Sequence, residues 1–303
     1  LAGIAPEGLT RSLFLTSGSD ANEAAIAIAK RYTGGYEIAS PAVSFHGQSE
    51  AARAVTFTGW RQGYGPYSPG NYPMIAPYRY RCSFCKSKPD CDYSCLNTSF
   101  ELLDAQADGQ MAAVITEPLF SAGGVIDLPQ GWLQELKTCC RNRGMLLILD
   151  EAQTGLAKLG SMWASDQEDV IPDICTISKH FGGGIAVSAV MTTDEIESRV
   201  SETEFVVAHS HSNDPLTSNA AIASIDIILE QKLVEVSKQI GEYWRGHLNT
   251  LYDRYDLIGD IRGRGLLQGI ELVKDRVTKE PAYVEGHEIG RRCLENGLIF
   301  SLR

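Results

Sequence analysis

Long hydrophobic runs are absent from this sequence. A bilayer-spanning helix needs roughly 18 or more consecutive apolar residues, and the longest apolar segments here are strand-sized, such as residues 145–149. Basic residues are also in the minority, with 27 Lys and Arg against 38 Asp and Glu and a formal net charge of −11 at pH 7. Nucleic-acid backbones require a clustered basic surface. We therefore expect neither a membrane span nor a nucleic-acid partner.

Cysteine is sparse as well, with eight residues among 303. That number is too small for a disulfide-dense secreted scaffold, and Cys139, Cys140, Cys175 and Cys293 fall in segments that resemble buried helix or strand. A reducing, cytoplasmic setting is the expectation. The chain opens at Leu1 without an initiator Met, so we expect a piece of a longer polypeptide, and a mitochondrial location is the alternative to the cytoplasmic one.

Short apolar runs alternate with longer helical patterns along the first two thirds of the chain. Runs at 13–15, 112–116, 146–149 and 173–177 alternate with helical patterns at 21–32 and 132–142. This alternation predicts an α/β fold with a mainly parallel sheet sandwiched by helices, over a large domain at residues 1–213. Residues 214–303 are expected to hold an interdomain helix, with a helical pattern over 220–252, and part of a smaller C-terminal α+β domain. Residues 59–99 show neither period and are expected to leave the sheet as a long excursion.

A turn of small residues follows the first apolar run. Ser17, Gly18 and Ser19 precede a helical pattern in which Asp20 is a candidate N-cap and Glu23 stands three residues later. Backbone N–H groups, hydroxyls and the helix dipole would converge there, and a phosphate monoester suits such a place. An ordinary capped turn is the alternative.

Two charged residues come at the ends of later strands. Asp150 ends the apolar run 146–149, where it needs a cation or an N–H⁺ donor such as a protonated pyridine nitrogen; a helix cap or a metal ligand is the alternative. Lys179 follows the run 173–177 and precedes three glycines at 182–184. An amine desolvated at a strand end is suited to Schiff-base chemistry with an aldehyde cofactor, and a salt-bridged lysine is the alternative.

Taken together and in this order, the phosphate turn, the strand-end Asp and the strand-end Lys resemble the class III, or omega-type, aminotransferases among the fold-type-I pyridoxal-phosphate enzymes. Within that class the closest likeness is to the 2,2-dialkylglycine decarboxylases. It is carried by Leu-Ile-Leu-Asp-Glu-Ala-Gln-Thr-Gly at 147–155, Pro-Asp-Ile at 172–174, Asn-Asp-Pro-Leu at 213–216, Ile-Gly-Asp-Ile-Arg-Gly-Arg-Gly at 258–265 and the segment 271–281. The likeness is weakest from 59 to about 100.

The resemblance implies a pyridoxal 5'-phosphate enzyme that moves an amino group from an amino acid or amine to a 2-oxo acid. It implies that Lys179 forms the internal aldimine and shuttles a proton, and that Asp150 keeps the pyridine nitrogen protonated. Gln153 would hydrogen-bond the phenolic oxygen. Ala152 would pack beneath the ring, and Phe45 would stack above it where the decarboxylases have Trp.

The same resemblance assigns Ser17, Gly18 and Ser19 to the phosphate cup. Ser210 falls where the family uses a hydroxyl from the neighbouring subunit to complete that cup. The expected assembly is therefore a homodimer or a dimer of dimers, with the active site at the subunit interface.

Which reaction such a site performs is left open by departures from the decarboxylases. The family's substrate-carboxylate arginine would lie beyond residue 303, and an upstream glutamine would lie before residue 1. Ala122 stands where the decarboxylase has Ser, which favours transamination or a different substrate, with decarboxylation-dependent transamination as the alternative. A non-catalytic truncated paralogue is a further alternative, although intact Lys179, Asp150 and Gln153 argue against it.

Metal sites are weak candidates. Cys82, Cys85, Cys91 and Cys95 form the pattern C-x2-C-x5-C-x3-C, which could hold zinc at the centre of a binding module; free thiols or disulfides are the alternatives. Asp214 could serve an alkali ion, as the resemblance suggests, or act as an N-cap.

Three other polar residues have structural interpretations. We expect His46 to be a hydrogen-bonding neighbour of the site rather than an acid or base. Arg262 and Arg264 are expected to be structural clamps rather than substrate ligands.

Overall fold

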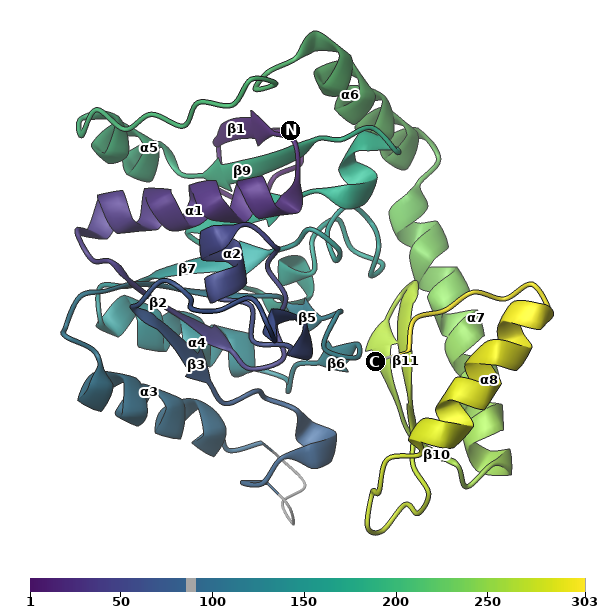
Figure 1. The fold of residues 1–303 in the computed structure, drawn as a ribbon. Coiled ribbons are helices and arrows are strands. Elements are labelled where there is room, and N and C mark those ends of the chain that lie inside the picture. The colour runs from purple at the N-terminus through teal and green to yellow at the C-terminus, as the bar shows by residue number, and fades with distance from the viewer. Residues whose placement is uncertain (86–90, 303) are drawn as a thin grey trace.

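The computed structural model describes residues 1–85 and 91–302. Its centre is a seven-stranded sheet in the order β1-β9-β8-β7-β4-β2-β3 (Figure 1). The strands are β1 (Arg11–Leu15), β2 (Glu37–Pro41), β3 (Asn71–Met74), β4 (Met111–Thr116), β7 (Leu146–Asp150), β8 (Ile174–Ile177) and β9 (Ser188–Thr192). Only β9 runs antiparallel to its neighbours β1 and β8; the other pairs in this sheet are parallel. The predicted α/β fold with a mainly parallel sheet is confirmed.

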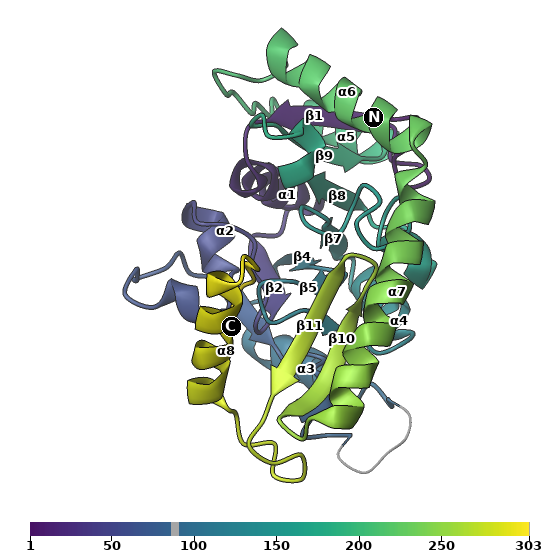
Figure 2. The ribbon, with the colours of Figure 1, turned by 90° about the vertical axis from the view of Figure 1, so that its right-hand side faces the viewer.

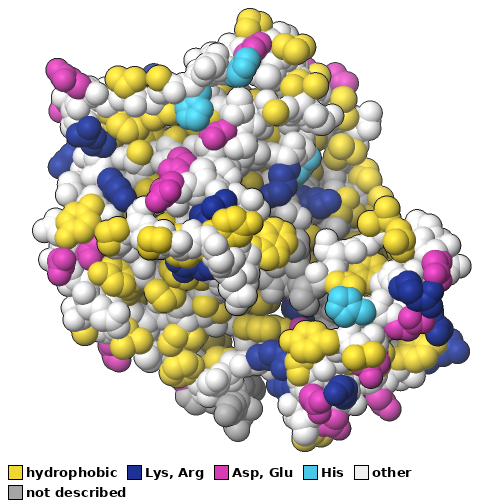
Figure 3. Space-filling view, viewed as in Figure 1, with side chains coloured by type: hydrophobic (Ala, Val, Ile, Leu, Met, Phe, Trp, Pro, Cys, Tyr) yellow, Lys and Arg dark blue, Asp and Glu magenta, His cyan; other side chains and the backbone are white. Residues whose placement is uncertain are grey.

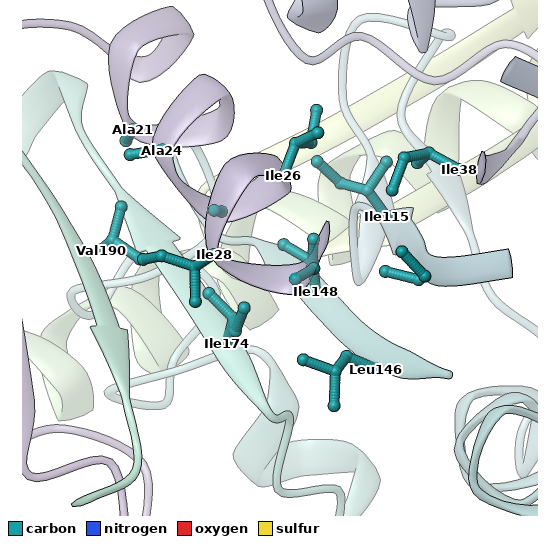
Figure 4. Close-up of a cluster of buried hydrophobic side chains, with 14 of the residues drawn as sticks. Ala21, Ala24, Ile26, Ile28, Ile38, Ile115, Leu146, Ile148, Ile174 and Val190 are labelled. Atoms are coloured by element: carbon teal, nitrogen blue, oxygen red, sulfur yellow. The ribbon is translucent and has the colours of Figure 1, made fainter. Parts of the chain in front are cut away.

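Helices cover both faces of this sheet. The helices α1 (Gly18–Thr33), α2 (Glu50–Ala54) and α5 (Asp194–Ser201) lie on one side, and α3 (Ser94–Gln106) and α4 (Trp132–Asn142) lie on the other (Figures 1 and 2). Successive residues of β7 face opposite ways: Ile148 packs with Ile28 of α1, while Leu147 and Leu149 pack with the α3 and α4 side (Figure 4). Both faces of the strand are therefore buried, which explains why its sequence is continuously apolar.

The chain then leaves the sheet through two helices. The helical pattern expected over 220–252 is two helices, α6 (Pro215–Glu230) and α7 (Leu233–Arg254), because Lys232 between them has a φ of 50° in the left-handed region. Next comes an antiparallel hairpin of β10 (Ile258–Arg264) and β11 (Leu267–Leu272), followed by α8 (Tyr283–Glu295). Figure 2 shows α7 and α8 flanking this hairpin. The domain boundary proposed at Asp214 coincides with the N-cap of α6.

The contact between α7 and the hairpin depends on two glycines. A Cβ added to Gly241 of α7 would lie 2.6 Å from the Cα of Gly265. Arg245 of the same helix donates to the carbonyls of Ile261 and Gly263, at 2.8 and 2.7 Å. Close backbone approach and a half-buried guanidinium therefore fix the hairpin against the helix.

The excursion at residues 59–99 contains more regular structure than its sequence suggests. Asn71–Met74 forms the parallel edge strand β3, and short 3₁₀ turns occupy Gly59–Arg61 and Arg79–Arg81. Pro73 lies in β3, which an edge strand tolerates because one side of its backbone needs no ladder partner. A four-residue strand interrupted by proline has too little period-2 signal to be recognised from sequence.

Two further observations concern the surface. Among the residues described, no helix has both the length and the apolar character that a membrane crossing demands. On the face drawn in Figure 3, Lys and Arg side chains are interspersed with Asp and Glu. This face shows no single basic patch.

Candidate active site

The carboxyl ends of the parallel strands bring the predicted residues to one edge of the sheet. Asp150 is the last residue of β7, and Lys179 follows β8 after one intervening residue. The turn at Ser17 follows β1, which runs parallel to β8 because both are antiparallel to β9. In open α/β sheets this edge is where ligands bind.

Asp150 is a buried carboxylate with three hydrogen-bond donors. The residue is only 4% exposed. Asn22 Nδ2 and His46 Nδ1 lie 2.7 and 2.9 Å from Oδ2, and the N–H of Ala152 donates to Oδ1 at 3.0 Å. Because a carboxylate oxygen has two lone pairs, Oδ1 keeps the capacity to accept one further N–H.

The charge on Asp150 is favoured despite its burial. Burial alone would raise the pKa of this carboxyl group. The hydrogen bond and charge interaction with His46, together with the Lys179 ammonium, outweigh burial and hold the pKa below its ordinary value of 3.8. The group is therefore an anion at neutral pH and can stabilise a protonated ring nitrogen.

His46 is held in one orientation by polar groups on both sides. Its Nδ1 faces Asp150, its Nε2 lies 3.2 Å from Ser40 Oγ, and its backbone N–H donates to Thr56 Oγ1 at 2.9 Å. Since the carboxylate is an acceptor, His46 Nδ1 carries a proton and donates it to Asp150. The residue is only 2% exposed. It orients Asp150, in line with the hydrogen-bonding role expected from the sequence.

Lys179 is exposed, so the desolvation expected of its amine from the sequence is not found, and it lies in a strained backbone conformation. Its φ is 56°, in the left-handed region, and its neighbour Ser178 is buried and extended. A non-glycine residue in this region costs free energy of order 1–3 kcal/mol and is enriched at functional sites. This left-handed conformation turns the chain away from β8 just after the strand ends. The Lys179 ammonium lies close enough to Asp150 to lower the pKa of the Asp150 carboxyl group.

The turn at the start of α1 differs in one respect from the sequence prediction. The N-cap is Ser17 rather than Asp20, because helical backbone already begins at Gly18. Asp20 is instead the third helical residue of a capping box: its N–H donates to Ser17 Oγ at 3.2 Å, and its Oδ2 accepts from the Ser17 N–H at 3.0 Å. The Ser17 hydroxyl also donates to Asp20 at 2.8 Å, so it is engaged within the turn.

The anion-binding capacity of this turn therefore rests mainly on backbone. The N–H groups of Gly18 and Ser19 are in the first helical turn, where no intrahelical acceptor exists for them. Ser19 Oγ accepts from the Gln48 N–H at 3.1 Å. A Cβ at Gly18 would stand 3.5 Å from the Ser178 Cβ and 3.7 Å from the Ala152 Cβ, so the turn, Ala152 and the residue before Lys179 are neighbours.

A second buried carboxylate, Glu117, links the residues expected around the ring. Its Oε1 accepts the Phe45 N–H at 2.9 Å, and its Oε2 accepts the Ser121 N–H and Oγ–H at 3.1 and 2.8 Å. Ser121 Oγ also lies 3.4 Å from Gln153 Oε1. Burial raises the pKa of Glu117 above its usual value. Through Glu117 and Ser121, the positions of Phe45 and Gln153 are coupled.

Sequence reasoning missed Glu117 and Asn22. Asn22 is 1% exposed, and its amide reaches Asp150, the His46 carbonyl and Thr176 Oγ1 at once. One signal was available for Asn22, because it is a polar residue on the apolar face of α1 beside Ala21, Ala24 and Ala25. Glu117 directly follows the apolar run 112–116, as Asp150 follows the apolar run 146–149, so the same sequence signal was available for it.

Ser210 and Asp214 lie in and after the segment between α5 and α6. Ser210 is exposed there, and its neighbour His209 lies close enough to Asp20 of the Ser17 turn to interact with that carboxylate electrostatically. Asp214 is the N-cap of α6, accepting from the Leu216 N–H at 3.0 Å, so the cap interpretation describes its role in this structure. His211 Nδ1 lies 3.3 Å from the same carboxylate. Ala122 is half-buried, next to Ser121.

The four cysteines of the excursion lie near one another without forming a metal centre. Cys85 Sγ is 4.0 Å from Cys91 Sγ and hydrogen-bonds Cys82. Burial, with neighbouring thiols, raises the pKa of Cys85 to about 12 and that of Cys95 to about 11. In the described ranges 1–85 and 91–302, no group of three or more His, Cys, Asp or Glu side chains is arranged to hold a metal ion. The cysteines are free thiols here.

Arg262 and Arg264 clamp the hairpin to the sheet domain, as expected. Arg262 Nη2 lies 2.7 Å from Glu271, and its Nε donates to the Gly124 carbonyl at 2.9 Å. Arg264 Nη2 lies 2.6 Å from both Asp127 and Glu168. Neither arginine contacts Asp150 or Lys179 in the hydrogen bonds and ion pairs of the described residues.

The chain is similar to known proteins over almost its whole length. A family model described as aminotransferase class-III matches residues 1–302. An uncharacterised aminotransferase of Schizosaccharomyces pombe is 42% identical over 98% of this chain and 67% of that protein. A leucine/methionine racemase of Thermococcus litoralis is 34% identical over 99% of this chain and 68% of its own length.

Solved structures agree with this similarity. An aminotransferase of Bacillus anthracis superposes with a TM-score of 0.91 at 30% identity, covering 98% of this chain and 69% of its own. The omega transaminase of Pseudomonas jessenii, solved in complex with PMP, gives a TM-score of 0.92 at 26% identity, covering 99% of this chain and 70% of its own. The chain thus spans about two thirds of the length of these relatives.

Proposed function

The chain belongs to the class-III aminotransferase family of pyridoxal-phosphate-dependent transaminases, and from this premise we propose that it transfers an amino group from an amino acid or amine to a 2-oxo acid. The observation that carries the proposal is the position of Asp150 and Lys179 at one sheet edge, close enough for the Lys179 ammonium to lower the pKa of Asp150. The carboxylate is kept ionised by Asn22, His46 and the Lys179 ammonium. Such a constellation suits a cationic pyridine ring and a reactive amine.

The residues present fit pyridoxal phosphate. The Asp150 Oδ1 has room for one more donor, and a protonated ring nitrogen would fill it. The first turn of α1 offers N–H groups to a phosphate. Between these two points, Ala152 and Phe45 would bound the two faces of a ring. Bound there, the cofactor supplies an aldehyde that takes up amino groups and a ring that accepts electrons.

The chain's own residues would divide the work as follows. Lys179 would hold the cofactor covalently and then, once free, move a proton at its Nζ. Asp150, oriented by His46 and Asn22, would keep the ring nitrogen protonated. Gln153, placed through Ser121, would hydrogen-bond the phenolic oxygen.

Decarboxylation-dependent transamination is a second candidate. The segments 258–265 and 271–281, which resemble those of 2,2-dialkylglycine decarboxylases, support it. Ala122 in place of the decarboxylase serine favours plain transamination. The two activities are separated by supplying a 2,2-dialkylglycine, which has no Cα hydrogen, with a 2-oxo acid. Release of CO₂ with formation of a new amino acid would establish the second candidate.

We further propose that the active site is completed by a second copy of the chain. Ser210 is exposed in the segment between α5 and α6, so its hydroxyl is accessible to the phosphate turn of a neighbouring copy. A dimer whose phosphate affinity falls when Ser210 is replaced by Ala would support this arrangement. A fully active monomer would contradict it.

The test of the function is spectroscopic. The purified protein, incubated with pyridoxal phosphate, should gain a visible absorbance band that borohydride bleaches, and mass mapping should find the label on Lys179. Adding an amino donor should shift the band, and a 2-oxo acid should restore it. A protein that binds no cofactor under these conditions would favour the non-catalytic paralogue.

A further inference from the structure

An aromatic residue outside the predicted site packs against Phe45. The rings of Phe45 and Trp60 meet edge to face, with centroids 5.0 Å apart and planes at 80°. Aromatic pairs prefer this geometry, with centroid separations of about 4.5–7 Å. Trp60 is 48% exposed, so part of its surface covers Phe45 and part faces solvent.

The loop that carries Trp60 is itself fixed by an arginine stacked on two aromatic rings. Trp60 lies in the 3₁₀ turn Gly59–Arg61. The Arg61 guanidinium lies 4.4 Å from the ring centroid of Phe57 and 4.2 Å from that of Tyr67. The Tyr67 hydroxyl donates to the Arg61 carbonyl. Contacts on both sides of Arg61 therefore set where its neighbour Trp60 lies.

Phe45 is constrained on its backbone side as well. Its N–H is bound by Glu117, and the next residue, His46, contacts Asp150. These bonds fix the Phe45 backbone but leave its χ angles free. Among the described residues, the aromatic ring that contacts the Phe45 ring is that of Trp60. It restricts the rotation that the backbone bonds leave open.

We infer that Trp60 is a positioning residue that holds the Phe45 ring over the cofactor. The inference rests on the proposed function, because it requires the pyridoxal-phosphate ring to lie between Phe45 and Ala152. With Trp60 in place, Phe45 is already oriented before the cofactor binds. Without it, binding must order the ring, and affinity falls by the strength of the lost contact.

The experiment measures binding of pyridoxamine phosphate, a cofactor form held without a covalent bond to Lys179. Equilibrium dialysis would give its Kd for the wild type and for Trp60→Ala, Trp60→Phe, Phe45→Ala and the double variant Phe45→Ala/Trp60→Ala. We expect Trp60→Ala to raise Kd by about two- to tenfold, the range that an aromatic pair supplies. Trp60→Phe should retain most of the affinity.

The double variant separates positioning from general disruption. Once Phe45 is Ala, loss of Trp60 should raise Kd no further, because the two residues act through one contact. The matched control is Tyr64→Ala, an exposed aromatic of the same loop whose ring lies under Arg53 rather than against Phe45. Its Kd should equal that of the wild type.

Each outcome decides the inference. It is overturned if Trp60→Ala leaves Kd unchanged, if the effect persists undiminished in the Phe45→Ala background, or if Tyr64→Ala has an equal effect. A wild-type protein that binds no pyridoxamine phosphate would refute the proposed function itself. Wild-type binding with an unaffected Trp60→Ala variant would refute the role of Trp60 alone.

Discussion

Replacing Asn22 by Ala should destabilise the fold and weaken the site together. The Asn22 side chain is almost fully buried and makes three hydrogen bonds to three separate elements. It donates to Asp150 Oδ2 at 2.7 Å and to the His46 carbonyl at 2.7 Å, and it accepts from Thr176 Oγ1 at 2.8 Å. Alanine keeps the helix and removes all three bonds.

The expected magnitude follows from what is left unpaired. A hydrogen bond to a charged group contributes about 1.5–3 kcal/mol and one between neutral groups about 0.5–1.5 kcal/mol, so the sum for one charged and two neutral bonds is about 4 kcal/mol. Asp150 also loses one of the donors that stabilise its charge. Its pKa should therefore rise, and affinity for a ligand with a protonated ring nitrogen should fall.

Urea unfolding followed by circular dichroism measures the first effect, and pyridoxamine phosphate binding measures the second. Asn97→Ala is the matched control, since Asn97 is exposed on α3 and the same change there should alter the unfolding free energy by about 0.5 kcal/mol or less. A loss below about 1 kcal/mol at Asn22, with unchanged binding, would refute the view that this amide supports Asp150.

Three other changes test neighbouring parts of the argument. Lys179→Ala should abolish transamination while leaving the circular dichroism spectrum unchanged, and retained turnover would refute the lysine's assignment. Because the folded-state pKa of Asp150 lies below 3.8, its charge stabilises the fold above that pH; the stability advantage of the wild type over Asp150→Asn in urea should shrink as pH falls below 3.8. Arg264→Met leaves Glu168, itself 7% exposed, without its partner and should cost about 3–5 kcal/mol in urea unfolding; adding Glu168→Gln should recover much of that loss, and no recovery would contradict the ion pair.

Much of the sheet could be predicted because its signal is local. A strand buried on both faces is continuously apolar, and β7 carries that pattern in its first four residues, before Asp150. The positions of Asp150 and Lys179 follow from the same signal, since parallel strands place their carboxyl ends at one edge. The edge strand β3 gave no such signal, because only one of its four residues is fully buried.

The capping error at α1 has a different physical origin. Ser17 and Asp20 are both good N-cap residues, and either could accept the first backbone N–H groups. The structure uses both, with Ser17 as the cap and Asp20 reaching back to it. The sequence of such a reciprocal pair is the same whichever residue is the N-cap. The assignment therefore depends on backbone dihedral angles, which the sequence does not give.

What sequence could not supply is the set of partners that make Asp150 an anion. Its donors come from α1, from the loop after β2 and from the residue two positions along its own chain. None of these contacts can be inferred from residue types. Burial alone would raise the pKa of the Asp150 carboxyl group, so these contacts are what lower it. Once Asp150 is buried, its charge is maintained by the donors that α1 and the His46 loop bring to β7. The electrostatic property that a pyridine cofactor requires is therefore a product of tertiary folding, and any substitution that loosens that docking should lower cofactor affinity before it unfolds the chain.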